Sequence, residues 1–439
     1  MPRRKQLFRC KKRRDTVNWK IALAIMSAAV FMMGGSYTMV IPFLPLFIAR
    51  DLGAAPENVN LLTGVAFSIS FVITFIAAPI WGRLADLYGR KPMFLRSCFT
   101  ITICYFLFFI VRNPTELILA RALQGFGAGM LPIAFSITSA WAPKEKIGIA
   151  MGTLQGVHIS GTVFGPLFGG LLADSFGVRS AFLIAGFILL FLGVLVTLTV
   201  REPKKREDTK NSEKGTYRRL LHDSVILTVL SVTSLTAMAW LMQQPLMALF
   251  TSEVSGNAEK AASHAGIIFS VFGLAGAIAA PIWGWCGQRF GFFRMMVTSG
   301  IAGAICCAAV AFSSSFSILI AAFFVYGFCF AGIIPSANSI LILATRTEIR
   351  SSAFSLLFTA QMLGSAIGPV TGGMVATAAG NVSAVFITAG SSLLVFMIII
   401  AFAAPDRVRR ISRTNRSGLS EEELRAAQAQ EPDKTEQQA

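Results

Sequence analysis

Two ionisable side chains, Arg121 and His158, stand inside long apolar stretches of this sequence. Charged groups are costly at membrane depth and are usually functional there. An unperturbed histidine titrates at about pH 6.5, so His158 is suited to relay a proton near neutral pH. We therefore take Arg121 and His158 as candidates for relaying a proton or holding a substrate.

A structural role is open for both residues. Arg121 lies some five residues into its apolar stretch and could extend its guanidinium outward to the membrane surface. His158 could be a buried ring that hydrogen-bonds a neighbouring helix. The residue types alone do not decide between these roles.

No catalytic or metal-binding pattern accompanies the two residues. His158, His222 and His264 are scattered along the chain. Cys306 and Cys307 are adjacent, so they do not share one helix face, and no histidine lies near them, which does not suit a metal site. The sequence also has no nucleophile elbow, zinc-protease motif or phosphate-binding glycine loop. We expect no enzyme activity, no cofactor and no bound metal.

The composition is that of a membrane protein, because 54% of residues are apolar, 14% are charged and the mean hydropathy is +0.65. Apolar runs of roughly 18 or more residues can cross a bilayer as helices, and helices satisfy their own backbone hydrogen bonds in lipid. We predict an all-α polytopic membrane protein with twelve transmembrane helices, at 21–48, 61–82, 93–111, 116–142, 147–174, 180–200, 224–250, 264–285, 293–313, 315–343, 351–378 and 383–404.

Basic residues are distributed unevenly among the loops. The formal net charge is +17, yet the loops that follow odd-numbered spans contain only Arg50, Arg112, Arg179 and Lys260. Lys and Arg beside short loops stay in the cytoplasm, so we predict that both termini are cytoplasmic. We interpret the basic clusters in residues 1–14 as membrane anchors and not as a nucleic-acid site.

A charged segment divides the apolar runs into two sets of six. Residues 201–223 carry alternating charges and helix breakers, which is typical of a linker. The predicted organisation is a basic N-terminus at 1–20, a six-helix bundle at 21–200, the linker at 201–223, a second six-helix bundle at 224–404 and a cytoplasmic tail at 405–439.

The two sets of helices share an internal repeat. The string IAAPIWG occurs at 76–82 and again at 278–284, an offset of 202 residues. At an offset of 203, GTVFGPLFGG (161–170) aligns with GSAIGPVTGG (364–373), and four glycines and a proline coincide. Because the offset spans an even number of helices, both copies keep one orientation. This parallel repeat is typical of two-bundle transporters.

Three motifs resemble those of the major facilitator superfamily and, within it, the twelve-helix drug:proton antiporters. They are GRLADLYGRK at 82–91, RALQGFGAG at 121–129 and GTVFGPLFGG at 161–170, and the resemblance covers about 400 residues. It implies export of amphiphilic drugs or toxic small molecules by alternating access, in exchange for protons, across the cytoplasmic membrane of a bacterium. We expect a monomer whose partners are those molecules, protons and the bilayer.

The first motif suits a gate. Gly82 and Gly89 would allow a tight reversal between helices, and Asp86 could accept hydrogen bonds from a helix N-terminus. The resemblance implies that this partner helix begins at Arg350, so we expect Asp86 to meet the amides near Ser351 and Ser352 when the cytoplasmic gate is shut. A solvated turn amid basic residues is the alternative. The predicted gate residues are Gly82, Asp86, Gly89, Arg90 and Lys91.

The third motif suits close helix packing. Gly161, Gly165 and Gly169 recur at four-residue spacing on one helix face, which lets a neighbouring helix approach. Pro166 removes a backbone donor and bends the helix. Together with Gly170, these residues are predicted chiefly to pack helices, and the resemblance implies that their contact also closes the outer gate.

The predicted substrate cavity lies between the bundles. His158 aligns with Gln361, so each half offers a polar group at a matching height. No Asp or Glu lies within the spans away from a helix end. With Arg121 present, the cavity should therefore disfavour dications and accept neutral, zwitterionic or anionic amphiphiles. Each wall residue could instead pack between helices or face lipid. The wall candidates are adaptable or flat side chains, namely Tyr37, Phe43, Met238, Met242, Gln243, Asn338, Phe358 and Gln361.

Two other functions are open. A carrier for a sugar or another metabolite would share the fold, but its cavity should offer more amide, acid and Trp contacts than these spans contain. A membrane sensor or structural protein would need an attached soluble domain, and the tail at 405–439 is too short to form one. The sequence therefore favours an exporter.

Overall fold

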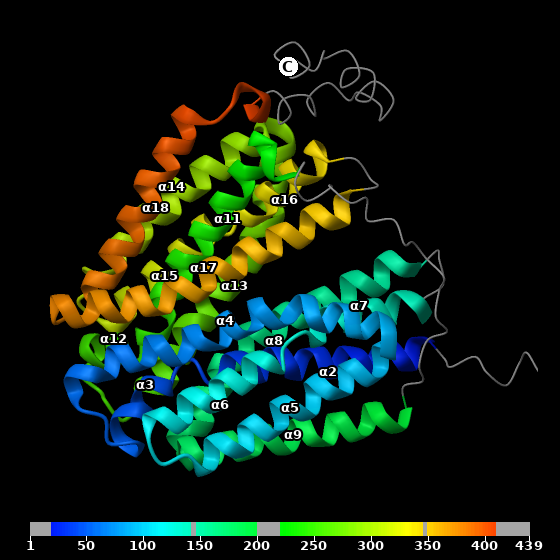
Figure 1. Ribbon diagram of the computed structural model, residues 1–439. Helices are drawn as coiled ribbons and strands as arrows, with labels where there is room; N and C mark the ends of the chain where they lie inside the picture. The colour runs from blue at the N-terminus through cyan, green and yellow to red at the C-terminus, as the bar shows by residue number, and fades with distance from the viewer. Residues whose placement is uncertain (1–18, 142–145, 200–219, 346–348, 410–439) are drawn as a thin grey trace, which may run out of the picture.

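The computed structural model describes residues 19–141, 146–199, 220–345 and 349–409, and within these ranges it is helical without strands. The all-α fold predicted from the apolar runs is confirmed. In Figure 1 the helices of residues 19–199 form one group, coloured blue to green, and those of residues 224–403 form another, coloured green to red. Most of the predicted N-terminus, linker and tail lies outside the described residues.

The first group follows the predicted order of spans. Its elements are α2 (Trp19–Met39), α3 (Leu44–Leu46), the π-helix η1 (Phe47–Asp51), α4 (Pro56–Tyr88), α5 (Arg90–Ile110), α6 (Pro114–Phe126), α7 (Met130–Trp141), α8 (Ile147–Phe176) and α9 (Val178–Thr199).

The second group repeats this order. Its elements are α11 (Ser224–Gln243), the 3₁₀ turn η3 (Gln244–Leu246), α12 (Met247–Ser255), α13 (Ala261–Phe290), α14 (Phe292–Val310), α15 (Phe316–Phe330), α16 (Ile333–Ala344), α17 (Arg350–Ala379) and α18 (Ser383–Ala403).

Within the described ranges, ten helices are long and apolar enough to span a membrane. The pair of helices Leu23–Met39 and Leu44–Asp51 makes an eleventh if it is counted as one span. The pair is bent by 46° beside Pro42, which lacks a backbone donor. The predicted span 116–142 differs, because α6 and α7 divide it into two short helices. The division falls at Gly129, whose φ of 112° is open to glycine and strained for other residues.

The two ends of the helix groups are distinct. We call the end where α9 stops and α11 starts the linker end, and the opposite end the far end. At the linker end, Gly89 joins α4 to α5 with a φ of 100°, and its repeat mate Gly291 joins α13 to α14 with a φ of 99°. Both halves therefore reverse direction with the same left-handed glycine.

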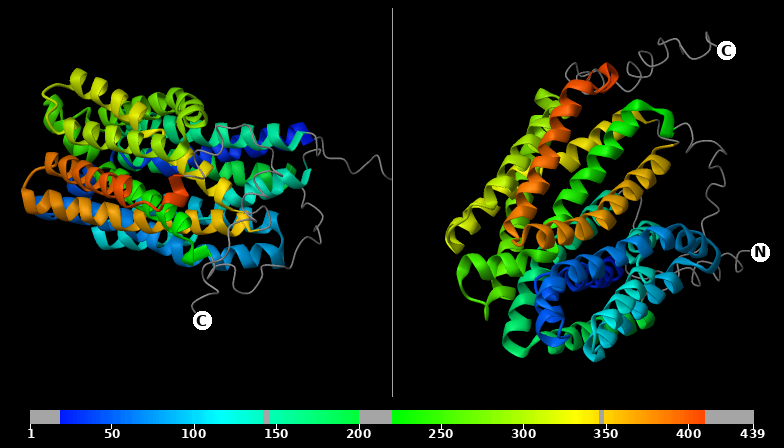
Figure 2. Two further views of the ribbon diagram at one scale, coloured as in Figure 1. Left: turned by 90° about the horizontal axis from the view of Figure 1, so that it is seen from above. Right: turned by 60° about the vertical axis from the view of Figure 1, so that its left-hand side comes forward.

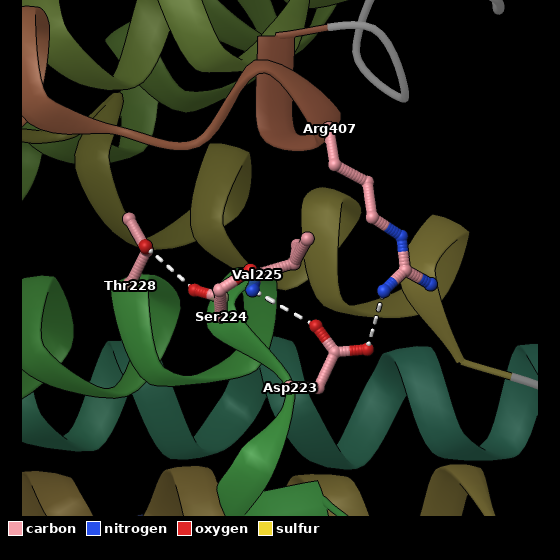
Figure 3. A network of polar contacts seen from close by, with 5 residues as sticks. All are labelled: Asp223, Ser224, Val225, Thr228 and Arg407. Atoms are coloured by element: carbon pink, nitrogen blue, oxygen red, sulfur yellow. Dashed lines mark hydrogen bonds and ion pairs between the residues drawn. The ribbon is translucent and has the colours of Figure 1, made fainter. Parts of the chain in front are cut away.

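A polar network anchors the linker end of α11 (Figure 3). Asp223 accepts a hydrogen bond from the Val225 N–H at 2.9 Å and another from the Arg407 guanidinium at 3.0 Å. Thr228 Oγ1 donates to the Ser224 carbonyl oxygen at 2.8 Å. The carboxylate caps a free helix amide and ties the segment after α18 to the start of α11.

The helix groups approach each other at the far end. In Figure 1 and in the right panel of Figure 2, α17 (yellow to orange) and α4 (blue) lie together at the far end and separate toward the linker end. Contacts between α8 and α13 and between α4 and α17 join the two groups. The described helices are thus closed against each other at one end.

Candidate functional site

Two helix crossings join the groups, and the internal repeat relates them. A Cβ atom at Gly64 of α4 would collide with the Pro369 carbonyl oxygen of α17, and one at Gly266 of α13 would collide with the Pro166 carbonyl oxygen of α8. Gly64 aligns with Gly266, and Pro166 aligns with Pro369. Each crossing therefore seats a proline carbonyl of one half on a glycine of the other half.

Two hydrogen bonds reinforce the crossings. Ser68 Oγ accepts the Val370 N–H at 3.1 Å, and its repeat mate Ser270 donates to the Val163 carbonyl oxygen at 2.8 Å. These four residues lie at the middle or in the far-end half of their helices. They form part of the closure at the far end.

The glycine motif of α8 has two faces. Cβ atoms at Gly161, Gly165 and Gly169 would collide with the α2 backbone, whereas one at Gly170 would collide with the Ala262 carbonyl oxygen of α13. The first three glycines pack α8 within its own group, and the fourth contacts the other group. The copy in α17 packs in the same way, with Gly364, Gly368 and Gly372 on α11 and Gly373 on α4.

Arg121 lies inside the first group on α6, with only 2% of its surface exposed. Its Nη1 donates to Gln124 Oε1 at 2.8 Å, and its guanidinium carbon lies 5.0 Å from the Phe67 ring centre and 5.2 Å from that of Phe108. Within the described residues, its Nε and Nη2 have no hydrogen-bond partner. Buried donors without partners cost free energy, so this site favours the approach of an anionic group or water.

Two tyrosines lie within electrostatic range of Arg121. Tyr105 is fully buried and donates to the Ser36 carbonyl oxygen. Tyr37 is 38% exposed and meets Phe71 edge-on, with 6.2 Å between the ring centroids. Tyr37 is therefore the accessible member of the cluster.

The second group has a neutral, aromatic interior. Gln243 is fully buried, and its Nε2 donates to Tyr326 Oη at 2.7 Å. Trp240 stacks on Phe272 with 4.0 Å between the ring centroids. The Gln243 amide thus hydrogen-bonds a tyrosine of its own group, and the aromatic rings pack on one another there.

His158 lies on α8 and is half-buried beside α2. A Cβ atom at Gly34 would lie 3.0 Å from the His158 carbonyl oxygen and 3.3 Å from its ring carbon Cδ2, so the ring packs on that glycine. The contacts described above for Arg121 come from α4, α5 and α6. The structure gives no contact between Arg121 and His158 among the described residues, so the predicted pair is not brought together.

The gate motif is mostly helical. α4 continues through Gly82 to Tyr88, and Gly89 alone makes the reversal, which corrects the expectation of a turn shared by both glycines. One left-handed residue is enough to reverse the chain, so Gly82 remains within the hydrogen-bonded helix. α17 begins at Arg350. The side chains of Asp86 and Ser351 lie outside the described part, so their contact remains a prediction.

The basic residues of the gate motif begin α5. Arg90 is the first residue of this helix and Lys91 is the second. Lys91 Nζ donates to the Thr197 carbonyl oxygen of α9 at 2.8 Å. This bond stays within the first group and ties α5 to α9 at the linker end.

The predicted cavity residues divide by burial. Tyr37 and Phe358 are 38% and 46% exposed, and Met238, Asn338 and Gln361 are half-buried. The side chains of this set are thus accessible at least in part. Asn338 also has a buried Oδ1 atom without a hydrogen-bond partner within the described residues.

Three predicted wall residues are instead buried in helix packing. Phe43 packs edge-on against Phe182 with 5.4 Å between the ring centroids. Met242 packs against Gly372 of α17, and Gln243 hydrogen-bonds Tyr326 of its own group. They do not line an open cavity in this structure, and their assignment to the cavity wall stays a prediction. The pattern could not predict their burial because these helices are apolar on every side.

Sequence reasoning missed the contacts that support the break between α6 and α7. Arg96 of α5 donates to the carbonyl oxygens of Phe126 at 3.1 Å and Ala128 at 3.0 Å. Its guanidinium carbon lies 3.5 Å from the ring centre of Trp81, whose Nε1 also donates to Phe126. These donors satisfy carbonyl groups that a helix end leaves free. The tryptophan repeated in IAAPIWG was the available signal.

Comparison with known proteins decides the family. The family described as Major Facilitator Superfamily matches residues 26–263 and 232–431. The chain belongs to this superfamily. Multidrug resistance protein MdtG of Rahnella sp. (strain Y9602) is 31% identical over 378 residues, covering 85% of this chain and 92% of that protein. The multi-drug resistance efflux pump PmrA homolog of Lactococcus lactis subsp. lactis (strain IL1403) is 32% identical over 391 residues, covering 88% and 95%.

Solved structures share the fold. The nucleoside transporter NupG has a TM-score of 0.74 at 15% identity, covering 88% of this chain and 98% of that one. A bacterial homolog of the human lysosomal transporter Spinster, in an inward-facing and occupied conformation, has a TM-score of 0.69 at 16% identity, covering 90% and 97%. The predicted resemblance to this superfamily and to multidrug efflux relatives is confirmed. The chain is a multi-pass membrane protein of a transporter family.

Proposed function

We propose that this superfamily member exports amphiphilic drugs or toxic small molecules by alternating access, in exchange for protons. The relatives named for multidrug resistance support the substrate class. The pair of repeat-related crossings is the observation that carries the transport cycle. Glycine–carbonyl contacts bring backbones close without interlocking side chains, so two bundles can part and rejoin there.

The proposed orientation follows from the basic loops. The linker end faces the cytoplasm, because cytoplasmic loops hold the excess of Lys and Arg, and the far end faces outside. Closure at the far end then corresponds to an inward-facing form of a monomer. In the opposite form, Asp86 closes the linker end by meeting the first turn of α17, which begins at Arg350.

Arg121 supports a preference against dications. Its Nε and Nη2 lack partners within the described residues, and its neighbours are a neutral amide and aromatic rings. An uncompensated positive charge repels a second cation strongly in a medium of low dielectric constant. Neutral, zwitterionic and anionic amphiphiles are the proposed substrates, with Tyr37 and Phe358 among their contacts.

Purified protein in liposomes tests this function. Neutral, anionic and dicationic fluorescent amphiphiles that share one ring system would be compared with and without a pH gradient. In this gradient, protons flow down their concentration difference in the direction opposite to export. We expect the gradient to drive neutral and anionic probes, with the dication transported at least about tenfold more slowly. Gradient-independent transport would contradict proton exchange. Tighter binding of the dication than of its neutral analogue would contradict the charge preference.

A metabolite carrier is the second candidate, and one observation favours it. Asn338 has a buried Oδ1 atom without a partner among the described residues, and Gln361 is half-buried on α17. Such amides could bind the hydroxyl or ring-nitrogen groups of a polar metabolite. Saturable exchange of a sugar or nucleoside in the same vesicles, with no movement of the amphiphiles, would favour this carrier over the exporter.

A further inference from the structure

One carboxylate bridges the two groups at the far end. Asp174, near the end of α8, accepts a hydrogen bond from the Ser263 N–H at 2.9 Å and another from the Ser263 hydroxyl. Ser263 lies in the first turn of α13, which begins at Ala261 and has no side-chain cap from its own N-cap residue, Lys260. The first turn of a helix has free N–H groups and a partial positive charge. The first group therefore supplies the cap for a helix of the second group.

The repeat shows that this contact is an addition to the crossing. At the position that aligns with Asp174 the second half has Thr377, and at the position that aligns with Ser263 the first half has Leu61. The close packing beside it is common to both crossings, as the Gly170 and Gly373 contacts show. The carboxylate contact thus belongs to only one of two otherwise similar crossings.

The surroundings of Asp174 provide a matched control. Asp174 borders a pocket of about 430 Å³ that Arg50, Asp51 and Glu259 also line. Asp51 pairs with Arg179 of its own group, with 3.7 Å between Oδ1 and Nε. The two carboxylates thus share a pocket, but Asp174 bonds across the groups and Asp51 bonds within one.

We propose that Asp174 is a latch that holds the outer gate shut in the inward-facing form. Its bonds to Ser263 form when the bundles meet at the far end and break when they separate, so they stabilise only the closed arrangement. Asp174 is exposed, which limits the strength of a single contact with a helix terminus. The latch therefore biases the equilibrium between the two forms and does not lock it. This inference depends on the alternating access proposed above.

The experiment measures access to the seam from outside. A Ser68→Cys reporter lies at the other crossing, so the loss of a local bond at Asp174 does not expose it directly. Full-length protein in oriented vesicles is treated with a membrane-impermeant maleimide, and modification at position 68 is quantified by mass spectrometry. Asp174→Asn keeps the side-chain size but removes the charge, and Asp174→Glu keeps the carboxylate.

We expect Asp174→Asn to raise the modification rate about fivefold, with Asp174→Glu close to the parent and Asp51→Asn unchanged. Equal rates in Asp174→Asn and the parent would overturn the latch, as would an equal rise in Asp51→Asn. If Asp174→Asn does not fold, Ser263→Ala tests the same contact, with about a twofold rise expected from the loss of one donor. The assay needs no substrate. A failure of drug transport would therefore contradict the proposed function without affecting this result.

Discussion

In the first bundle, the buried Arg121 occupies the position that the buried Phe323 occupies in the second bundle. Tyr37, beside Arg121, likewise aligns with Trp240, which stacks on Phe272. The crossings between the bundles have instead kept matching Gly–Pro contacts in both copies. The duplication has thus preserved the surfaces on which the bundles meet, while the two interiors have diverged into a cationic one and an aromatic one.

The strongest test of matching crossings replaces their glycines one at a time. Gly64→Val and Gly266→Val each place a side chain against a proline carbonyl of the other bundle. Overpacking should oppose closure at the far end by about 3 kcal/mol, so we expect each variant to lower transport about hundredfold. Vesicle efflux measures this loss. The thermal unfolding midpoint should change little, because the packing inside each bundle is untouched. Markedly different losses in the two variants would show that the crossings are not equivalent.

The next test concerns the break in the fourth helix of each half, which separates α6 from α7 in the first and α15 from α16 in the second. Arg96 binds two carbonyl oxygens at the first break, whereas Ser299 of α14 binds one at the second break, that of Cys329, at 2.6 Å. Hydrogen bonds from a charged donor are the stronger kind. We expect Arg96→Ala to lower the free energy of unfolding by about 2 kcal/mol and Ser299→Ala by about 1 kcal/mol, as measured by denaturant titration in detergent. The reverse order would refute the view that the first break is more firmly supported.

Charge preference should reside in the first bundle alone. Arg121→Gln removes the buried charge, and we expect the export rate of an anionic amphiphile to fall about tenfold relative to its neutral analogue. Gln243→Leu is the control in the second bundle, because it breaks the bond to Tyr326 without changing a charge. In this variant, the export rates of the anionic and the neutral amphiphile should change by the same factor. A matching change of selectivity in Gln243→Leu would assign the preference to both bundles.

The smallest effect is expected at position 158, where one substitution makes the first half identical to the second at the aligned position. His158→Gln gives α8 the residue that α17 has at the aligned position 361. If His158 relays protons, the export rate should change by about threefold or less at pH 8 but lose its dependence on pH between about 6 and 7.5. Efflux measured across that range decides the point. An unchanged pH profile would leave His158 with only its packing role beside Gly34.

Much of the fold could be predicted from the sequence because the bilayer acts on composition directly. A segment that crosses lipid must be long, apolar and helical, and the apolar runs met this requirement without reference to their neighbours. The break at Gly129 was not predicted. Glycine is tolerated within membrane helices, and the donors that support the break, Arg96 and Trp81, come from other helices.

The candidate site was predicted less completely. The glycines at 161, 165 and 169 could be assigned to packing from their spacing, which places Gly170 on another face, but nothing in the sequence showed that this face meets the other bundle. The burial of Phe43 and Gln243 could not be foreseen, since a helix that is apolar on all sides carries no periodic signal of what it faces.

By itself, the sequence determined the helical membrane fold, the parallel duplication and the family, because segment length, apolar composition and repeated motifs are properties of the linear chain. Only the tertiary structure decided which residues meet across the bundles. The contacts of Pro166 with Gly266 and of Asp174 with Ser263 join positions about 100 and 89 residues apart. Such pairs depend on how two helices cross, and their crossing is determined by the packing of the whole molecule.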